Sequence, residues 1–217
     1  VSSKFASGSI SYETALSLYP MDLFAAQALT LSIQRYGQNE RTLFSFLEAT
    51  GQGSLQSFVE GKHTTYSLAD VYDYDIYNFY SYLSEINADS AAWTSIRVSL
   101  ERVEGLFEGD IATAAIALVK TIGMINLFGK AGVQLDKKAL SIYARAALGI
   151  NTPGDIIDLL TQHKIIRYAT YKSQFILFEG TDVNIEGELL KATGIVPRSK
   201  DVIDKLLTNF NLPIEFA

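Results

Sequence analysis

The stretch 110–180 most narrows the folds open to this chain, because helical patterns there give way abruptly to strand patterns. Apolar residues recur at helical spacing over 110–127 and 136–148, and a third helix is expected after Thr152 and Pro153. Thr152 can cap the unpaired N–H groups of that helix, and Pro153 suits its first position, where a missing N–H costs nothing. The sequence therefore predicts three consecutive helices.

Two short runs of β-branched and aromatic residues follow these helices, at 165–170 and 175–179. The four residues between them, 171–174, have the length of a hairpin loop, so we expect one antiparallel β-hairpin. Three helices followed directly by a hairpin is the element order of a winged helix. We therefore predict a mainly α-helical fold, a helical bundle followed by a winged-helix module with one β-hairpin.

Helical signals also dominate the first half of the chain. In the second helix expected there, Leu43, Phe44 and Leu47 are predicted to form the buried stripe. The helices are expected over 21–36, from Asn39 to before Gly51, over 68–83 and over 88–106.

The net charge changes sign where the pattern of elements changes. It is −7 over 1–109, +3 over 110–180 and −2 over 181–217. We therefore predict a helical domain over 1–109 and a winged-helix-like domain over 110–217, the latter ending in a helix near 202–210. Only the middle segment would attract a polyanion, and its charge surplus is small.

The composition limits the cellular compartment and the cysteine chemistry expected of the protein. The 217 residues include no cysteine, which excludes disulfides and thiolate metal sites and fits a cytoplasmic protein. The chain begins with Val1 and has no apolar leader, so we expect an excised part of a longer protein or a processed chain. The apolar stretch 111–128 has Lys120 in its middle, which favours a core helix and no membrane contact.

The chain lacks a phosphate-binding loop of its own. A P-loop requires two glycines, a lysine and a Ser or Thr at fixed spacing, so that backbone N–H groups can surround the phosphates. Neither Gly61–Lys62 nor Gly129–Lys130 has that spacing. We therefore expect no nucleotide hydrolysis and no cofactor in the isolated chain.

No group of residues has the spacing of a metal or acid–base site. His63 and His163 lie a hundred positions apart, and neither belongs to a local ligand cluster. Asp73 and Asp75 are two residues apart on an expected helix, so their side chains point in different directions and are predicted to form a solvated acidic face. We predict neither catalytic residues nor metal ligands.

The most specific segment is Gly-Gln-Asn-Glu-Arg-Thr-Leu-Phe-Ser-Phe-Leu at 37–47. Gly37 ends one helix, Asn39 caps the next, and Arg41 falls in its first turn. The helix dipole disfavours a cation there unless an anion partners it. We therefore expect Arg41 to pair either with a neighbouring carboxylate or with a phosphate.

This segment resembles the lid domain of AAA+ ATPases, in which an arginine after a glycine turn acts as the second sensor of the bound nucleotide. Together with Tyr19–Pro20, it is more closely similar to a region of large bacterial and archaeal P-loop ATPases of origin-recognition-like and STAND types, some associated with phage defence. In those proteins a winged helix follows, whose counterparts here would be 120–129 and the hairpin ending at 178–182.

The resemblance covers about 18–188 and implies a non-catalytic role. It implies that Arg41 and Asn39 sense a nucleotide, and that the winged helix relays the result by docking protein or DNA. The P-loop domain, with its ATP and Mg²⁺, is absent from the chain and would have to be supplied in cis or in trans.

The alternative is a stand-alone winged-helix module that binds DNA or another protein. Its third helix carries Asp155 and Asp158, which suit base readout poorly, whereas Lys164, Arg167 and Lys172 can contact phosphates. We expect weak, non-specific DNA binding at most, and place protein docking ahead of it. An enzyme with an unrecognised active site is the third reading, and no motif demands it.

Overall fold

The computed structural model describes residues 12–37, 40–48, 51, 53–61, 65–83, 88–129 and 134–178. Within them the fold is mainly α-helical with one two-stranded antiparallel sheet, which confirms the predicted helical bundle and β-hairpin. The helix predicted at 202–210 lies outside the described residues. In chain order the elements are α2 (Tyr12–Ser17), α3 (Leu23–Tyr36), α4 (Glu40–Glu48), α5 (Leu55–Glu60), α6 (Leu68–Leu83), α7 (Ser90–Leu106), α8 (Gly109–Phe128), α9 (Lys137–Ala147), α10 (Pro153–Gln162), β1 (Ile166–Ala169) and β2 (Gln174–Leu177).

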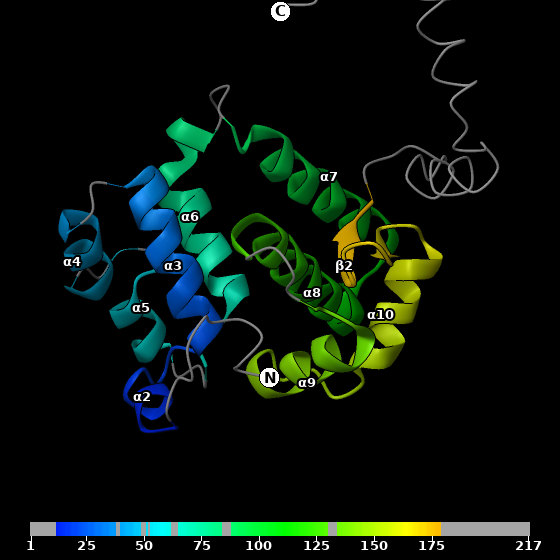
Figure 1. Cartoon of the computed structure of the whole chain (residues 1–217), viewed down its shortest axis with the longest axis horizontal. Coiled ribbons are helices and arrows are strands. Elements are labelled where there is room, and N and C mark those ends of the chain that lie inside the picture. The colour runs from blue at the N-terminus through cyan, green and yellow to red at the C-terminus, as the bar shows by residue number, and fades with distance from the viewer. Residues whose placement is uncertain are drawn as a thin grey trace, which may run out of the picture. The chain divides into compact units, whose positions relative to one another are not determined.

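The apolar helix α8 is the central element of the described fold. Figure 1 shows it between α3 and α6 on one side and α10 and β2 on the other, and it also packs along α7. Its length and composition would suffice to cross a membrane, and half of it is buried inside this structure. Lys120 in its middle reaches outward, where its Nζ lies 2.6 Å from a carboxylate oxygen of Asp73 on α6.

Helices α7 and α8 approach each other closely at Gly123. A Cβ atom added to Gly123 would lie 2.5 Å from Cγ1 and 2.7 Å from Cδ1 of Ile96, so only glycine lets the two helices approach this closely. The described residues before and after position 109 belong to one compact unit. The change in charge near residue 109, on which we based the domain boundary, is therefore not a break in packing.

The start of α3 is fixed by a side chain that sequence patterning did not single out. Asp22 Oδ1 accepts hydrogen bonds from the backbone N–H groups of Phe24 at 2.7 Å and Ala25 at 3.0 Å. These bonds satisfy two of the donors that every helix start leaves unpaired. The helix therefore begins after Asp22, slightly later than predicted.

The winged-helix part has the predicted element order of α8, α9 and α10 followed by β1 and β2. The hairpin pairs Ile166 with Leu177 at one end and Ala169 with Gln174 at the other. Leu135, between α8 and α9, adds a one-residue bridge to the start of β2, which periodicity alone did not predict. This bridge ties the connection between the first two helices to the sheet.

An arginine of α7 holds the turn between α10 and β1. Arg102 donates 2.9 Å hydrogen bonds to the backbone oxygens of His163 and Lys164. These carbonyls follow the last turn of α10, where a cation is favoured by the helix dipole. The first half of the chain therefore supports the hairpin directly.

Candidate functional site

The end of α3 lies close to the first turn of α4. A Cβ atom added to Gly37 would lie 2.8 Å from the backbone oxygen of Ile33 and 2.9 Å from Oγ1 of Thr42. Any larger residue would push α4 away from α3. Arg41 is therefore presented beside the end of α3, at a fixed place on the surface.

Arg41 is exposed. Four ion pairs form among the described residues, and none of them includes Arg41. Asn39, the other residue that the resemblance assigns to nucleotide sensing, lies outside the described residues. The carboxylate alternative for Arg41 thus has no counterpart in the part of the chain that the structure describes. The pairs are Arg35–Asp89, Arg97–Glu101, Lys120–Asp73 and Lys137–Asp158.

The predicted buried stripe of α4 is wrong. Leu43, Phe44 and Leu47 are 43%, 60% and 44% exposed, and it is Phe46 that is completely buried. The three exposed side chains lie on one side of α4 because residues three and four apart are neighbours on a helix. Arg41, three residues before Phe44, adjoins them. We call these four residues the α4 face.

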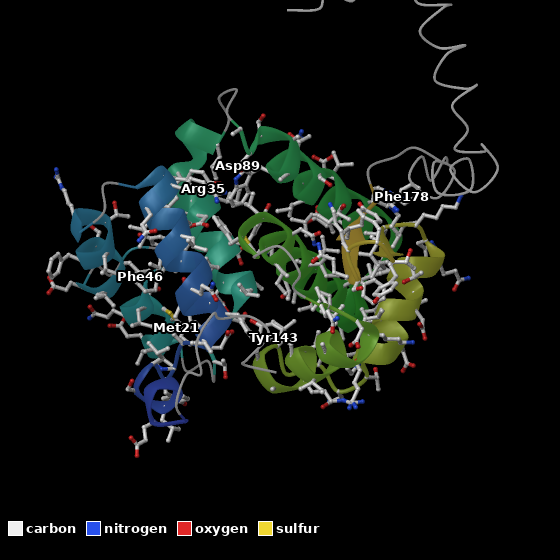
Figure 2. All side chains as sticks on the ribbon, in the orientation of Figure 1. Met21, Arg35, Phe46, Asp89, Tyr143 and Phe178 are labelled. Carbon is white, nitrogen blue, oxygen red and sulfur yellow. The ribbon has the colours of Figure 1, made fainter. Side chains whose placement is uncertain are left out.

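Phe46 anchors α4 to the rest of the fold (Figure 2). Its ring centroid lies 5.5 Å from that of Tyr66 and 5.0 Å from that of Tyr74, both in edge-on geometry. Such aromatic pairs add stability beyond the area they bury. One buried ring therefore holds α4 in place while its apolar stripe faces outward.

A solvent-facing apolar stripe beside a cation that has no ion-pair partner among the described residues is suited to binding another protein surface. Single exposed apolar residues are common, but a contiguous group on one helix marks an interaction site. Interfaces of this kind have an apolar centre and a polar edge, and arginine is enriched in them. The α4 face has the same composition.

The structure places the predicted phosphate-binding cations on different elements from Arg41. Lys164 is exposed in the turn after α10, Arg167 is half-buried on β1, and Lys172 is exposed in the hairpin loop. All three therefore belong to the hairpin and its approach. The third helix exposes Asp155 and Asp158, as the sequence indicated.

A hydrogen-bonded link joins the start of α3 to α9, on which Figure 2 labels Tyr143. The Tyr143 hydroxyl donates to Asp22 Oδ2 at 2.6 Å and accepts from the backbone N–H of Leu68 at 3.0 Å. Burial raises the pKa of Asp22, and the hydrogen bond from Tyr143 offsets part of that rise. The link spans 121 residues of sequence and was not predicted, although an N-cap search would have found Asp22.

A second polar link joins the end of α3 to the start of α7. Figure 2 shows Arg35 and Asp89 facing one another, and Arg35 Nη1 lies 3.0 Å from Asp89 Oδ2. Tyr36 donates to the same oxygen at 2.8 Å, and Trp93 Nε1 donates to the Tyr36 hydroxyl at 3.2 Å. Both ends of α3 are therefore tied to other helices.

The prediction that Asp75 faces solvent with Asp73 is wrong. Asp75 is completely buried, and Ser32 Oγ donates a 2.9 Å hydrogen bond to its Oδ1. Its Oδ2 has no hydrogen-bond partner among the described residues. Burial raises the pKa of this carboxyl well above its usual value. Asp73 is exposed, as expected, and pairs with Lys120.

The described residues contain no group of three or more His, Asp or Glu side chains arranged to hold a metal ion.

No family model, curated protein or solved structure matches the chain. The fold and the site together define a mainly helical protein with a winged-helix element order, an exposed arginine on an apolar helix face, and a basic hairpin.

Proposed function

We propose that this chain is the non-catalytic lid and winged-helix part of a P-loop ATPase. In this role Arg41 contacts the phosphates of a nucleotide held by the ATPase domain, and the winged helix passes the change on by docking protein or DNA. The ATPase domain is supplied in cis or in trans, with its ATP and Mg²⁺.

The α4 face carries this proposal. Arg41 is exposed, has no carboxylate partner among the described residues, and stands beside Leu43, Phe44 and Leu47. An arginine that senses a nucleotide on another domain must point out of its own domain. The domain that holds the nucleotide must then cover the surface around this arginine. The exposed apolar stripe is a surface of this kind.

The links at both ends of α3 support a relay. Asp22 connects α3 to Tyr143 on α9, and Arg35 connects it to Asp89 at the start of α7. A displacement of α4 acts on the end of α3 through the close approach of Thr42 to Gly37. The movement therefore has a packed route toward the winged helix.

The test begins with the coding sequence around this chain, which should encode a P-loop in the same frame or in a neighbouring gene. With chain and ATPase domain purified together, Arg41→Ala should weaken ATP binding about 10- to 100-fold, because it removes a hydrogen bond to a charged phosphate. Arg97→Ala is the control, since Arg97 is also exposed and its ion-pair partner among the described residues is Glu101. Equal ATP affinity of wild type and Arg41→Ala would overturn the sensing role.

A second measurement tests the covering of the α4 face. Phe44→Ser should weaken association with the ATPase domain in sedimentation, while circular dichroism of the chain alone stays unchanged because Phe44 is largely exposed. Association that survives Phe44→Ser and Leu47→Ser together would show that another surface holds the ATPase domain.

A further inference from the structure

The hairpin and the turn before it carry cations and exposed aromatic rings together. Lys164 and Lys172 are exposed, Arg167 is half-buried, and Tyr168 and Tyr171 are 42% and 45% exposed. We call the two lysines and the two tyrosines the wing surface. Arg167 precedes Tyr168 on β1, so its side chain points to the opposite face of the hairpin.

The wing surface lies in a segment of one charge sign. The stretch 159–178 contains three cations and no aspartate or glutamate. Two side chains of other described elements donate to its backbone, and neither is acidic: Arg102 donates to the carbonyls of His163 and Lys164, and Asn126 donates to the backbone oxygen of Phe175 at 3.2 Å. The wing surface therefore favours an anionic partner.

The two tyrosine rings are held in defined positions. Tyr168 packs edge-on against Phe175, with ring centroids 5.3 Å apart. Lys172 Nζ lies 5.4 Å from the centroid of the Tyr171 ring. Backbone bonds from Lys172 to Ala169 at 3.1 Å and from Ser173 to Thr170 at 3.2 Å close the loop. Ordered rings with exposed area cost little entropy on binding.

We propose that the wing surface binds an unpaired nucleic-acid strand, with Lys164 and Lys172 on its phosphates and its bases stacked on Tyr168 and Tyr171. Alternating cations and accessible rings are what single strands require, because every base offers a stacking face. In a duplex those faces are already stacked. The exposed Asp155 of α10 would in addition repel the phosphates that line a major groove.

This inference rests on the winged-helix part of the proposed function and names its partner. It does not depend on nucleotide sensing, since Arg41 lies on α4, outside the wing surface. The two ideas can therefore fail separately.

The experiment measures fluorescence anisotropy of labelled oligo(dT), oligo(U) and a DNA duplex of equal length with the full chain. Both single strands, or one of them, should bind more tightly than the duplex, and their comparison tells DNA from RNA. Replacing Tyr168 and Tyr171 by alanine should weaken binding about 5-fold or more for each ring. The Tyr→Phe variants should bind like wild type, because phenylalanine keeps the stacking face.

Two controls separate stacking from charge and from folding. Tyr77→Ala removes an exposed ring on α6, outside the wing surface, and should leave binding unchanged. Lys172→Ala should lower the slope of log affinity against log salt by about 0.7, as expected for one lost phosphate contact on a single strand. Arg41→Ala should bind the oligonucleotides like wild type even if it abolishes nucleotide sensing.

Three outcomes would overturn the inference. These are duplex binding as tight as single-strand binding, unchanged affinity in the Tyr→Ala variants, and no binding of any oligonucleotide at micromolar protein in low salt. The last result would leave protein docking as the role of the winged-helix module.

Discussion

Tyr143 on α9 donates a 2.6 Å hydrogen bond to Oδ2 of Asp22, the residue that caps α3 with its other carboxylate oxygen. One carboxylate thus caps the start of a helix and also joins two distant parts of the chain. Asp22 is largely withdrawn from solvent, so a lost donor cannot readily be replaced by water.

Tyr143→Phe tests this link. It keeps the ring contact with Phe24, whose centroid lies 5.8 Å away, and removes only the hydroxyl. We expect the free energy of unfolding to fall by about 1 to 3 kcal/mol, the cost of leaving a buried charged acceptor unpaired. Urea denaturation measures it, and Tyr77→Phe, at an exposed position, should change nothing.

Asp75 makes stability depend on pH. Because burial raises its pKa in the folded state, the folded chain holds this proton more tightly than the unfolded chain does. Its contribution to stability is therefore complete below about pH 4, near the ordinary pKa, and is lost as pH rises toward the folded pKa.

Asp75→Asn should remove this loss while keeping an acceptor for Ser32. The variant should be more stable than wild type at pH 8, and the difference should shrink toward pH 4 by about 1.4 kcal/mol for each pH unit within the titration range. Urea denaturation across this range measures it, with the exposed Asp73→Asn as control. The prediction would be contradicted if the free energy of unfolding changed between pH 4 and pH 8 by the same amount in the wild type and in Asp75→Asn.

Gly123→Ala tests the close approach of α7 and α8. The new methyl group would overlap the Ile96 side chain, so we expect a loss of about 1 to 3 kcal/mol. Gly105→Ala is the matched control, because its Cβ meets no atom within 4 Å. Relief of backbone entropy should make that control neutral or more stable by about 0.5 to 1 kcal/mol. Equal melting temperatures for the two variants would argue against the packing.

Arg102→Ala tests the support that α7 gives to the hairpin. Loss of the two hydrogen bonds to His163 and Lys164 should cost about 0.5 to 1.5 kcal/mol and speed amide hydrogen exchange in β1 and β2. Arg97→Ala, one turn earlier, removes only an exposed pair with Glu101 and should leave that exchange unchanged.

Capping rules and periodicity located most of the helices and both strands. Pro153 marked the start of α10 because an N-terminal proline acts locally, whereas the predicted capping by Thr152 is wrong, since its side chain makes no capping hydrogen bond. The hairpin followed from strand-forming residues around a four-residue loop. Local signals of this kind do not depend on what the element packs against. The winged-helix order was therefore predictable from the sequence.

The sequence predicted less well which side chains of a helix face the core, because this depends on distant parts of the chain. In α4 the helical spacing of Leu43, Phe44 and Leu47 is that of a buried stripe, yet the aromatic partners of α4 meet Phe46 on another side. Asp75 was expected in water because charged side chains usually are. Its burial follows from the position of Ser32, 43 residues away in sequence.

The central position of α8 has a consequence for how the molecule melts. A module that can be exchanged between proteins carries its own core, but the first helix of this winged helix is also the surface on which α6 and α7 pack. Cutting the chain before Gly109 would leave apolar faces uncovered on both pieces. The two halves should therefore unfold together in a single calorimetric peak, and neither should persist as an independently folded fragment.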